Sequence, residues 1–158
     1  MMKEISLSNG GIALIDDDDF ALVKPYRWYA RKDKHTSYAT TNIRLEDGAW
    51  KKLHMHRLIM NIKDGIQVDH KNLNGLDNRR CNLREATTAQ NKMNQGKHKG
   101  GSVFKGVSWC RYKWQSAISG KYIGIFSNEI EAAMAYDKAA RKLFGEYART
   151  NFMREEAK

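Results

Sequence analysis

The stretch of residues 68–94 places the tightest limits on how this chain can fold. It begins with Val68-Asp69-His70, which has strand character, and continues through the turn-rich sequence NLNGLDN. Farther on, Thr87-Thr88-Ala89-Gln90 has the form of a capping box, in which Thr87 caps a helix and Gln90 reaches back to it. These signals predict a strand, a long turn, a second extended piece and a helix that begins near Thr88.

Asp69 and His70 also offer the chemistry that hydrolysis of a phosphodiester requires. That reaction needs a base to activate water and a cation to neutralise the charge that grows on the phosphate. Asp69 supplies the hard carboxylate oxygen that Mg²⁺ prefers, and His70 can accept a proton near neutral pH. Because neighbouring strand residues point to opposite faces, we expect a bulge or a strand end that lets both side chains serve one site.

The order Asp69-His70, then Asn82, then Asn91 resembles the HNH nuclease motif, in the variant whose last histidine is asparagine. HNH endonucleases of this type occur in phages and self-splicing introns. The resemblance implies their ββα-metal fold with one divalent ion, Mg²⁺ or Mn²⁺. It also implies that His70 is the general base and that Asp69 and Asn91 are the metal ligands. Asn82 would brace the loop by hydrogen bonds and so orient His70.

The sequence beside the motif adds further expectations. Residues 53–60, LHMHRLIM, resemble the His-Arg-Leu-Ile segment that precedes the motif in those enzymes. We therefore expect His56 and Arg57 to support the site, with His56 in a structural or phosphate-facing role. Three basic residues are expected to contact DNA: Arg79, Arg80 and Arg84. The alternatives are a surface Asp-His pair without a catalytic role and, less favoured because no cysteine lies nearby, a zinc site at His54 and His56.

The distribution of charge points to the partner. The chain carries 28 Lys and Arg against 18 Asp and Glu, a formal net charge of +10, and no acidic residue occurs between residues 86 and 128. A like-charged stretch of this length repels itself unless a polyanion screens it, so we expect double-stranded DNA as the partner. Aromatic residues interleaved with the charges favour this view over that of a merely soluble basic protein.

Residues 103–152 alternate as strands do and then become helical. Strands are predicted at residues 105–109, 113–118 and 122–126. The sequence Asn128-Glu129-Ile130-Glu131 predicts the start of a helix, which Gly145 ends. We expect a three-stranded sheet packed on one face of this helix, and the residues expected on that face are Ile130, Met134, Ala139 and Leu143.

The sequences FKGV, KW, YIGIF, EAAMAYDKAA and TNF in this segment resemble the plant ethylene-response-factor type of DNA-binding domain, the apetala family. In that family the sheet enters the major groove, which implies that this segment reads duplex DNA. The contacts expected by position, with further basic contacts beside them, are Lys105, Trp114, Tyr122, Arg111, Lys113, Lys97, Lys99 and Lys121. Contact residues of the family fall on Ser108, Ala117 and Ser119 here, so we expect a different base preference.

The predicted fold class is α+β, with a β-rich segment at residues 1–50 and a ββα-metal HNH nuclease core at 51–94. A basic flexible linker follows at 95–102, and then the sheet-and-helix DNA-binding domain at 103–152. In the first segment EISL, IALI, ALV and SYATTNI are expected to be short strands. The acidic run at residues 16–19 is expected to be a solvated turn.

Together these features predict a metal-dependent DNA endonuclease of the homing or mobile-element type, without a membrane partner or a small-molecule substrate. No apolar run is long enough to span a bilayer, the N-terminus lacks the apolar core of a secretory signal, and the 2 cysteines form no C-x-x-C pair. We therefore expect an intracellular, cytoplasmic protein, compatible with a monomer, in a bacterial or phage-infected cell. The alternatives are a non-catalytic DNA-binding regulator and, supported by charge alone, an RNA-binding protein.

Overall fold

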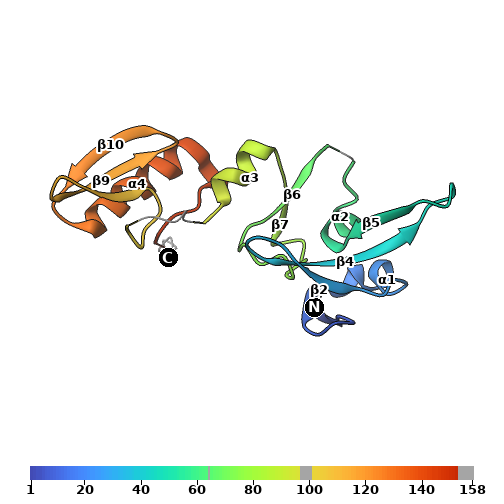
Figure 1. Cartoon of the computed structure of the whole chain (residues 1–158). Coiled ribbons are helices and arrows are strands. Elements are labelled where there is room, and N and C mark those ends of the chain that lie inside the picture. The colour runs from blue at the N-terminus through green and yellow to red at the C-terminus, as the bar shows by residue number, and fades with distance from the viewer. Residues whose placement is uncertain (64, 97–100, 153–158) are drawn as a thin grey trace. The chain divides into compact units, whose positions relative to one another are not determined.

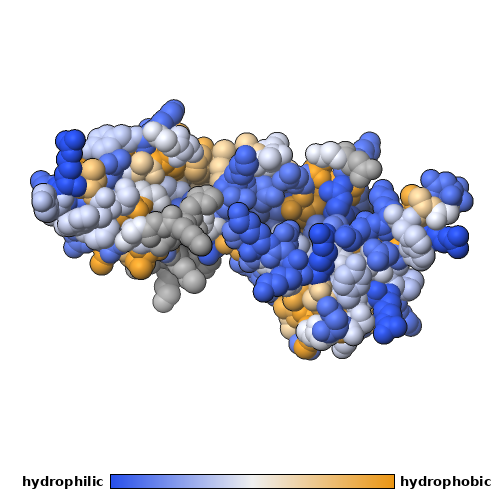
Figure 2. Space-filling model, in the orientation of Figure 1, coloured by the Kyte–Doolittle hydropathy of each residue, from blue (hydrophilic) through white to orange (hydrophobic). Residues whose placement is uncertain are grey.

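The computed structural model describes residues 1–63, 65–96 and 101–152, which fold into two compact units, Met1–Thr88 and Ala89–Lys158 (Figure 1). The fold is mixed α and β, with several small antiparallel sheets and few helices. Hydrophilic residues cover most of the face shown in Figure 2, and hydrophobic residues form small patches between them. Within the described residues, no helix is both long and apolar enough to cross a bilayer.

The first unit contains three antiparallel sheets. They are the hairpin β1–β2, the three-stranded sheet β3–β4–β5 and the hairpin β6–β7. In chain order the elements are β1 (Met2–Ser6), β2 (Ile12–Asp16), η1 (Asp17–Asp19), α1 (Phe20–Val23), β3 (Tyr29–Lys32), β4 (Ser37–Arg44), β5 (Trp50–His54), α2 (Met55–Met60), β6 (Gln67–His70) and β7 (Leu83–Ala86).

One hydrophobic core holds the first unit together. Its buried members come from sheets and helices alike and include Ile15 of β2, Ala39 of β4, Ile59 of α2 and Leu83 of β7. Because non-polar surface is removed from water in one continuous cluster, residues before and after position 50 stabilise each other. The predicted boundary between residues 50 and 51 therefore falls inside a single core.

Two local predictions in the first unit are wrong. The apolar run ALV lies in the helix α1 instead of a strand, since a short apolar run does not distinguish the two. The acidic run is not a solvated turn: Asp16 ends β2, and the following three residues form the 3-10 helix η1. Asp19 is buried, with 4% of its surface exposed, because its carboxylate pairs with the Arg80 guanidinium at 2.7 Å.

The second unit combines a three-stranded sheet with one long helix (Figure 1). The sheet has the order β10–β9–β8 and is antiparallel throughout. The elements are α3 (Thr88–Asn94), β8 (Val107–Cys110), β9 (Lys113–Ile118), β10 (Lys121–Phe126), α4 (Glu129–Phe144) and η2 (Gly145–Tyr147). The predicted helix start at Thr88 and the predicted sheet-plus-helix arrangement are both present.

The ends of α4 follow the sequence signals, whereas its buried face does not. Asn128 caps the helix by accepting a hydrogen bond from the Ile130 amide at 2.7 Å, and Gly145 ends it with a φ of 54°. The expected buried face is wrong at three of its four positions, because Ile130, Met134 and Leu143 are 47%, 58% and 53% exposed. The fourth, Ala139, packs against the core next to the buried Ala140. The residues that pack on the sheet instead include Ala132, Ala133, Tyr136 and Ala140. The three alanines among them have small side chains, which allow the helix to approach the sheet closely.

The end of the described chain is tied to α4 through Asp137. This carboxylate is buried and accepts hydrogen bonds from the amides of Asn151 and Phe152 at 2.8 and 2.9 Å, and from Asn151 Nδ2 at 3.1 Å. Asn151 in turn accepts from the Lys105 amide at 2.7 Å through its own Oδ1 atom. The TNF sequence therefore closes the sheet-and-helix fold.

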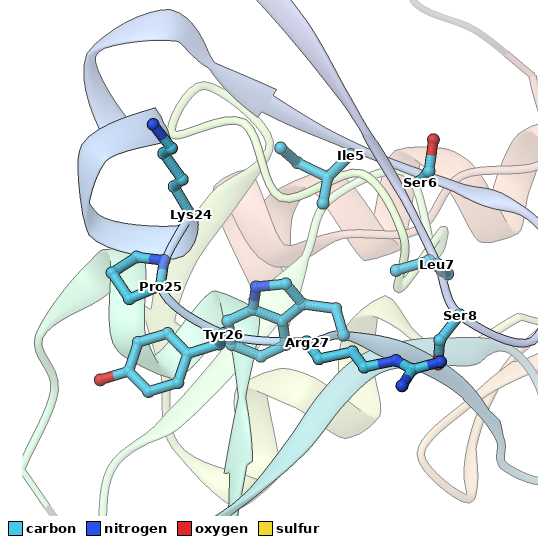
Figure 3. A pocket seen from close by; sticks show the side chains of 9 residues that line it. Ile5, Ser6, Leu7, Ser8, Lys24, Pro25, Tyr26 and Arg27 are labelled. Carbon is cyan, nitrogen blue, oxygen red and sulfur yellow. The ribbon is translucent and has the colours of Figure 1, made fainter.

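A surface pocket in the first unit is lined by residues 5–8 of β1 and its following turn and by residues 24–28 after α1 (Figure 3). None of the predicted site residues lines it. The indole of Trp28 is buried and donates to the Val23 carbonyl at 2.9 Å, so it serves to hold the segment after α1 in place.

Candidate active site

The hairpin β6–β7 carries the first two motif residues. Across it, Asp69 pairs with Arg84 and His70 pairs with Leu83. β6 ends at His70, and both motif side chains are buried, with exposed fractions of 3% for Asp69 and 5% for His70. The expected strand end is therefore present at His70.

Asn82 ties together the loop that joins β6 to β7. Its Oδ1 atom accepts a hydrogen bond from the Asn72 amide at 3.0 Å, and its Nδ2 atom donates to the Asp77 carbonyl at 2.7 Å. The Asp77 carboxylate also accepts from Asn72 Nδ2 at 2.8 Å. Since both Asn82 and Asp77 are buried, these bonds fix the course of the chain directly after His70.

Asn78, on the same loop, contacts the imidazole of His70. Its Oδ1 atom lies 3.5 Å from His70 Nε2, while its Nδ2 atom donates to the Leu76 carbonyl at 3.1 Å. Because the amide nitrogen is used by Leu76, the oxygen faces His70 as an acceptor, which favours the imidazole tautomer with its proton on Nε2. Burial lowers the pKa of His70, whereas the Asn78 hydrogen bond and the charge of Asp69 raise it in part. The imidazole is therefore neutral at neutral pH.

Arg84 holds the carboxylate of Asp69. Its Nε and NH2 groups donate to Asp69 Oδ2 at 2.8 and 2.7 Å, and its side chain is only 10% exposed. A buried carboxylate is strongly destabilising unless a charged or hydrogen-bonding partner compensates for its lost hydration. Arg84 supplies this compensation from the paired position on β7.

Aromatic rings from three other segments surround His70. Tyr38 of β4 lies 5.7 Å from the His70 ring and His56 of α2 lies 5.0 Å from it, measured between ring centroids. His54 at the end of β5 stacks on His56 at 5.3 Å. Burial, followed by the positive potential of the other two histidines, keeps the pKa of His56 well below its usual value. His56 is thus a neutral, buried wall of the site, consistent with the structural role expected for it.

Arg57, next to His56, closes the segment between α2 and β6. Its guanidinium donates to the carbonyls of Ile66 at 2.7 Å and Lys63 at 3.0 Å.

The Nδ1 atoms of His54 and His56 are buried and have no hydrogen-bond partner among the described residues. Within residues 1–63, 65–96 and 101–152, no group of three or more His, Cys, Asp or Glu is arranged to hold a metal ion. The zinc alternative therefore finds no such ligand group in that part of the chain.

The three arginines expected to contact DNA all pair with carboxylates of the first unit. Besides Arg84, Arg79 donates to both oxygens of Asp77 at 2.7 Å. Arg80 donates to Asp19 and to the Ile59 carbonyl at 2.9 Å. Their charges are thus used to fix the loop and the N-terminal segment around the site.

Asn91, the last motif residue, lies on α3, which belongs with the second unit from Ala89 onward. Lys105 stabilises the end of this helix: its Nζ donates to the carbonyls of Met93 at 2.7 Å and Gln95 at 2.6 Å. Burial, together with the charge of Arg149, lowers the pKa of Lys105 to about 8. A cation at a helix C-terminus is favourable, so Lys105 acts as a cap of α3.

The sheet of the second unit has one packed face and one open face. Trp114 packs with Phe126 against the buried side chains of Val107, Ala132 and Ala133, on the packed face. On the open face, Lys113 is exposed and Tyr122 is 63% exposed. Arg111 lies in the β8–β9 turn, with a φ of 47°, and is also exposed. Lys121 is exposed at the start of β10, whereas Lys97 and Lys99 lie outside the described residues.

Comparison with known proteins decides the family. A protein-family model described as HNH endonuclease matches residues 54–93. An uncharacterised HNH endonuclease of Acanthamoeba polyphaga mimivirus is 30% identical over 151 residues, which cover 90% of this chain and 75% of that protein. The chain belongs to the HNH endonuclease family. As an HNH endonuclease it is expected to bind DNA. The residues matched by the family model include His54, His56 and His70, the hairpin β6–β7 and most of α3.

A second similarity covers a smaller share of the chain. APETALA2-like protein 2 of Oryza sativa subsp. indica and its counterpart in subsp. japonica are each 38% identical over 68 residues. These residues cover 39% of this chain but only 16% of the rice proteins. No solved structure matches the chain.

Two residues of the site, Asn78 and Tyr38, were not predicted. Asn78 stands in the turn-rich sequence NLNGLDN, where the composition alone indicates a turn and not an imidazole partner. Tyr38 of β4 meets His70, at the end of β6, through a contact between residues far apart in the sequence, and such a contact leaves no local sequence signal. The Asp69–Arg84 register could have been found by pairing the two predicted extended pieces.

Proposed function

We propose that this HNH endonuclease hydrolyses DNA phosphodiester bonds with His70 as the general base. The observation that carries the proposal is the buried His70 imidazole at the end of β6, next to Asp69 and held by Asn78. A rigidly held neutral imidazole beside a carboxylate suits activation of water for attack on a phosphate. The loop braced by Asn82 keeps this geometry through its bonds to Asn72 and Asp77.

The roles of the other groups follow from their contacts. Asn78 holds the His70 imidazole by its Nε2 atom and so orients the ring for accepting a proton from water. His56 and Tyr38 exclude water from the other sides of the ring. Arg84 donates two hydrogen bonds to Asp69 and so fixes the orientation of its carboxylate.

The donor set fits a hard divalent cation. The carboxylate of Asp69 would hold Mg²⁺ or Mn²⁺, since such ions favour oxygen ligands and keep several of their waters, and Asn91 stays the second ligand that the HNH motif implies. When bound, the ion would neutralise charge on the phosphate and on the leaving oxygen.

The second unit supports binding of duplex DNA through the open face of its sheet. Lys113, Tyr122 and Arg111 are exposed there, and the similarity to the APETALA2-like proteins covers a comparable share of the chain. We leave Lys105 and Trp114 out of this contact set because the first caps α3 and the second packs on α4. A nuclease joined to a sheet of this kind fits a mobile-element or homing endonuclease.

Nicking of supercoiled plasmid tests the proposal. We expect the full chain to convert supercoiled plasmid into the open-circular form with Mg²⁺ or Mn²⁺ and not with EDTA. His70→Ala should reduce the rate by at least roughly 100-fold, the usual contribution of a general base. His35→Ala is the matched control, because His35 is exposed in the β3–β4 turn. Absence of nicking by the unaltered chain with either ion would leave the DNA-binding regulator as the better description.

A further inference from the structure

We propose that the outer face of the sheet β3–β4–β5 binds duplex DNA and guides it to His70. We define this outer face by six side chains: Arg31, Tyr38, Asn42, Arg44, Trp50 and Lys52. The inference rests on the proposed nuclease function for its purpose, and on the strand register for its location. It assigns a DNA contact to the N-terminal segment, in addition to the sheet of the second unit.

The register places these side chains on one face. Arg44 pairs with Trp50 and Asn42 pairs with Lys52 across β4 and β5. Arg31 of β3 pairs with Tyr38 of β4. Directly paired residues project from the same face of an antiparallel sheet, and alternate residues along a strand share that face, so all six lie together.

The opposite face of the same sheet is turned toward the core. Ala30 pairs with Ala39, and Thr41 pairs with Leu53. Ala39 is completely buried, and Ala30 and Leu53 pack against the core cluster. On the outer face, Thr40 between Tyr38 and Asn42 is also completely buried. The part of the outer face that solvent and a partner can reach is therefore the part that carries the exposed side chains of Arg31, Asn42, Arg44, Trp50 and Lys52.

The chemistry of the outer face matches a DNA backbone. Arg31, Arg44 and Lys52 are exposed, and cations of this kind pair with phosphates and release counterions. The indole of Trp50 is 71% exposed, so its ring is available to stack on a base or pack against a sugar of the backbone. The acidic residues of this segment all lie in the turns between the strands: Asp33, Glu46 and Asp47.

One end of the outer face reaches the candidate active site. Tyr38 lies 5.7 Å from the His70 ring, and His54, at the end of β5, lies 6.1 Å from Tyr38. The charges of Arg31 and Lys52 also act on His54, where they add to burial in lowering the pKa. The basic residues are thus close enough to the ring cluster to be felt electrostatically.

The length of this track sets how much DNA it can cover. Trp50 and His54 are the two ends of β5, and at about 3.3 Å per residue they are roughly 13 Å apart. Successive nucleotides of one DNA strand advance about 3.4 Å along the duplex, so the outer face spans about four base pairs. Contacts at Arg44 and Lys52 would therefore lie within a few phosphates of the scissile bond.

A pair of double variants tests the inference in the full chain. Arg44→Gln/Lys52→Gln removes two charges from the outer face. Lys32→Gln/Lys51→Gln removes two charges from β3 and β5 of the same sheet, at positions that the register assigns to the opposite face. Binding of a fluorescein-labelled duplex of about 30 base pairs is measured by anisotropy in EDTA, at several salt concentrations, so that cleavage does not enter.

We expect the outer-face pair to weaken binding roughly tenfold near physiological salt. The slope of log affinity against log salt should become shallower by about 1.8, which corresponds to two lost phosphate contacts. The opposite-face pair should change affinity less than about twofold. Thermal unfolding of both variants checks that the sheet remains folded. Equal losses from both pairs would show a general effect of charge and overturn the inference, as would an unchanged affinity of the outer-face pair.

The same measurement separates this inference from the proposed nuclease function. If the unaltered chain binds the duplex through the outer face but never nicks plasmid, the surface assignment stands and the catalytic proposal fails. If plasmid is nicked while the outer-face pair binds and cleaves as the unaltered chain does, the catalytic proposal stands and the surface assignment fails. Trp50→Ala adds an uncharged test, since loss of affinity without a change in salt slope would identify a stacking contact.

Discussion

Gly106 occupies a position in the second unit that should accept no side chain, and replacing it with alanine tests the packing of α4 on the sheet. Its φ is 76°, a region that disfavours residues with a Cβ atom. A Cβ there would collide with the ring of Tyr136 and would lie 2.8 Å from the Ala117 carbonyl oxygen. Tyr136 is 3% exposed, so its ring has little room to move away.

Gly120 separates the two contributions to the cost of this substitution. Its φ is 77°, nearly the same as that of Gly106, but a Cβ would meet nothing within 4 Å. Gly120→Ala should therefore show the backbone strain alone, about 1 kcal/mol. Gly106→Ala adds overpacking against a buried ring, which typically costs about 1–3 kcal/mol, so its total should reach about 3 kcal/mol.

Scanning calorimetry of the two variants measures this difference. A gap of about 2 kcal/mol corresponds to roughly 8–16 °C in the melting temperature of a domain of this size. Hydrogen exchange of peptides from β9 and α4 assigns the transition to the second unit. If the two alanine variants melt within about 2 °C of each other, Tyr136 does not pack on Gly106 as described, and the placement of α4 on the sheet is wrong.

Two further predictions concern charged groups. Arg84→Met should lower the free energy of unfolding of the first unit by about 3–5 kcal/mol, because it leaves the buried carboxylate of Asp69 without its guanidinium. Urea unfolding followed by the fluorescence of the buried Trp28 measures this loss, and a loss below about 1 kcal/mol would contradict the prediction. Burial lowers the pKa of Lys105 from 10.5 to about 8. Between these pH values the unfolded chain holds a proton that the folded chain has lost. The second unit therefore gains stability as the pH rises through this window. Because Lys105 is partly exposed, solvent screens this effect, and we expect a gain of only about 1–2 kcal/mol relative to Lys105→Met from pH 7.5 to 10.5. Urea unfolding measures it, and parallel pH profiles of the two proteins would refute it.

Local signals in the sequence predicted the elements that depend on local chemistry. The capping box at Thr87 and the N-x-x-E sequence at Asn128 each mark a helix start within one residue. The hairpin β6–β7 follows the two predicted extended pieces around the turn-rich loop. At Asn128 and in the loop between β6 and β7, nearby side chains supply the hydrogen bonds of the helix start and of the turn, so there the sequence contains the cause as well as the result.

Elements that depend on distant partners could not be predicted in the same way. The strand Tyr29–Lys32 is short and half charged, and it becomes a strand because β4 pairs with it. The buried face of α4 was assigned to its largest apolar residues, whereas close approach to the sheet selected the alanines and Tyr136. Size and hydropathy along one helix do not show how near its partner lies, and that distance decided which face is buried.

The arginines near the motif show why charge in a sequence does not locate a binding surface. Arg79, Arg80 and Arg84 count toward the net charge of +10, yet each neutralises a carboxylate that is at most 4% exposed. Replacing any of them would first destabilise the loop or the N-terminal segment, and the resulting loss of DNA affinity would be indirect. The cations left for an attraction to DNA are then those that are not used in this way, and they include the ones on the proposed outer face of β3–β4–β5 and on the open face of the second sheet. A salt titration distinguishes the two kinds of residue, because a phosphate contact changes the slope whereas a structural ion pair changes only the amount of folded protein.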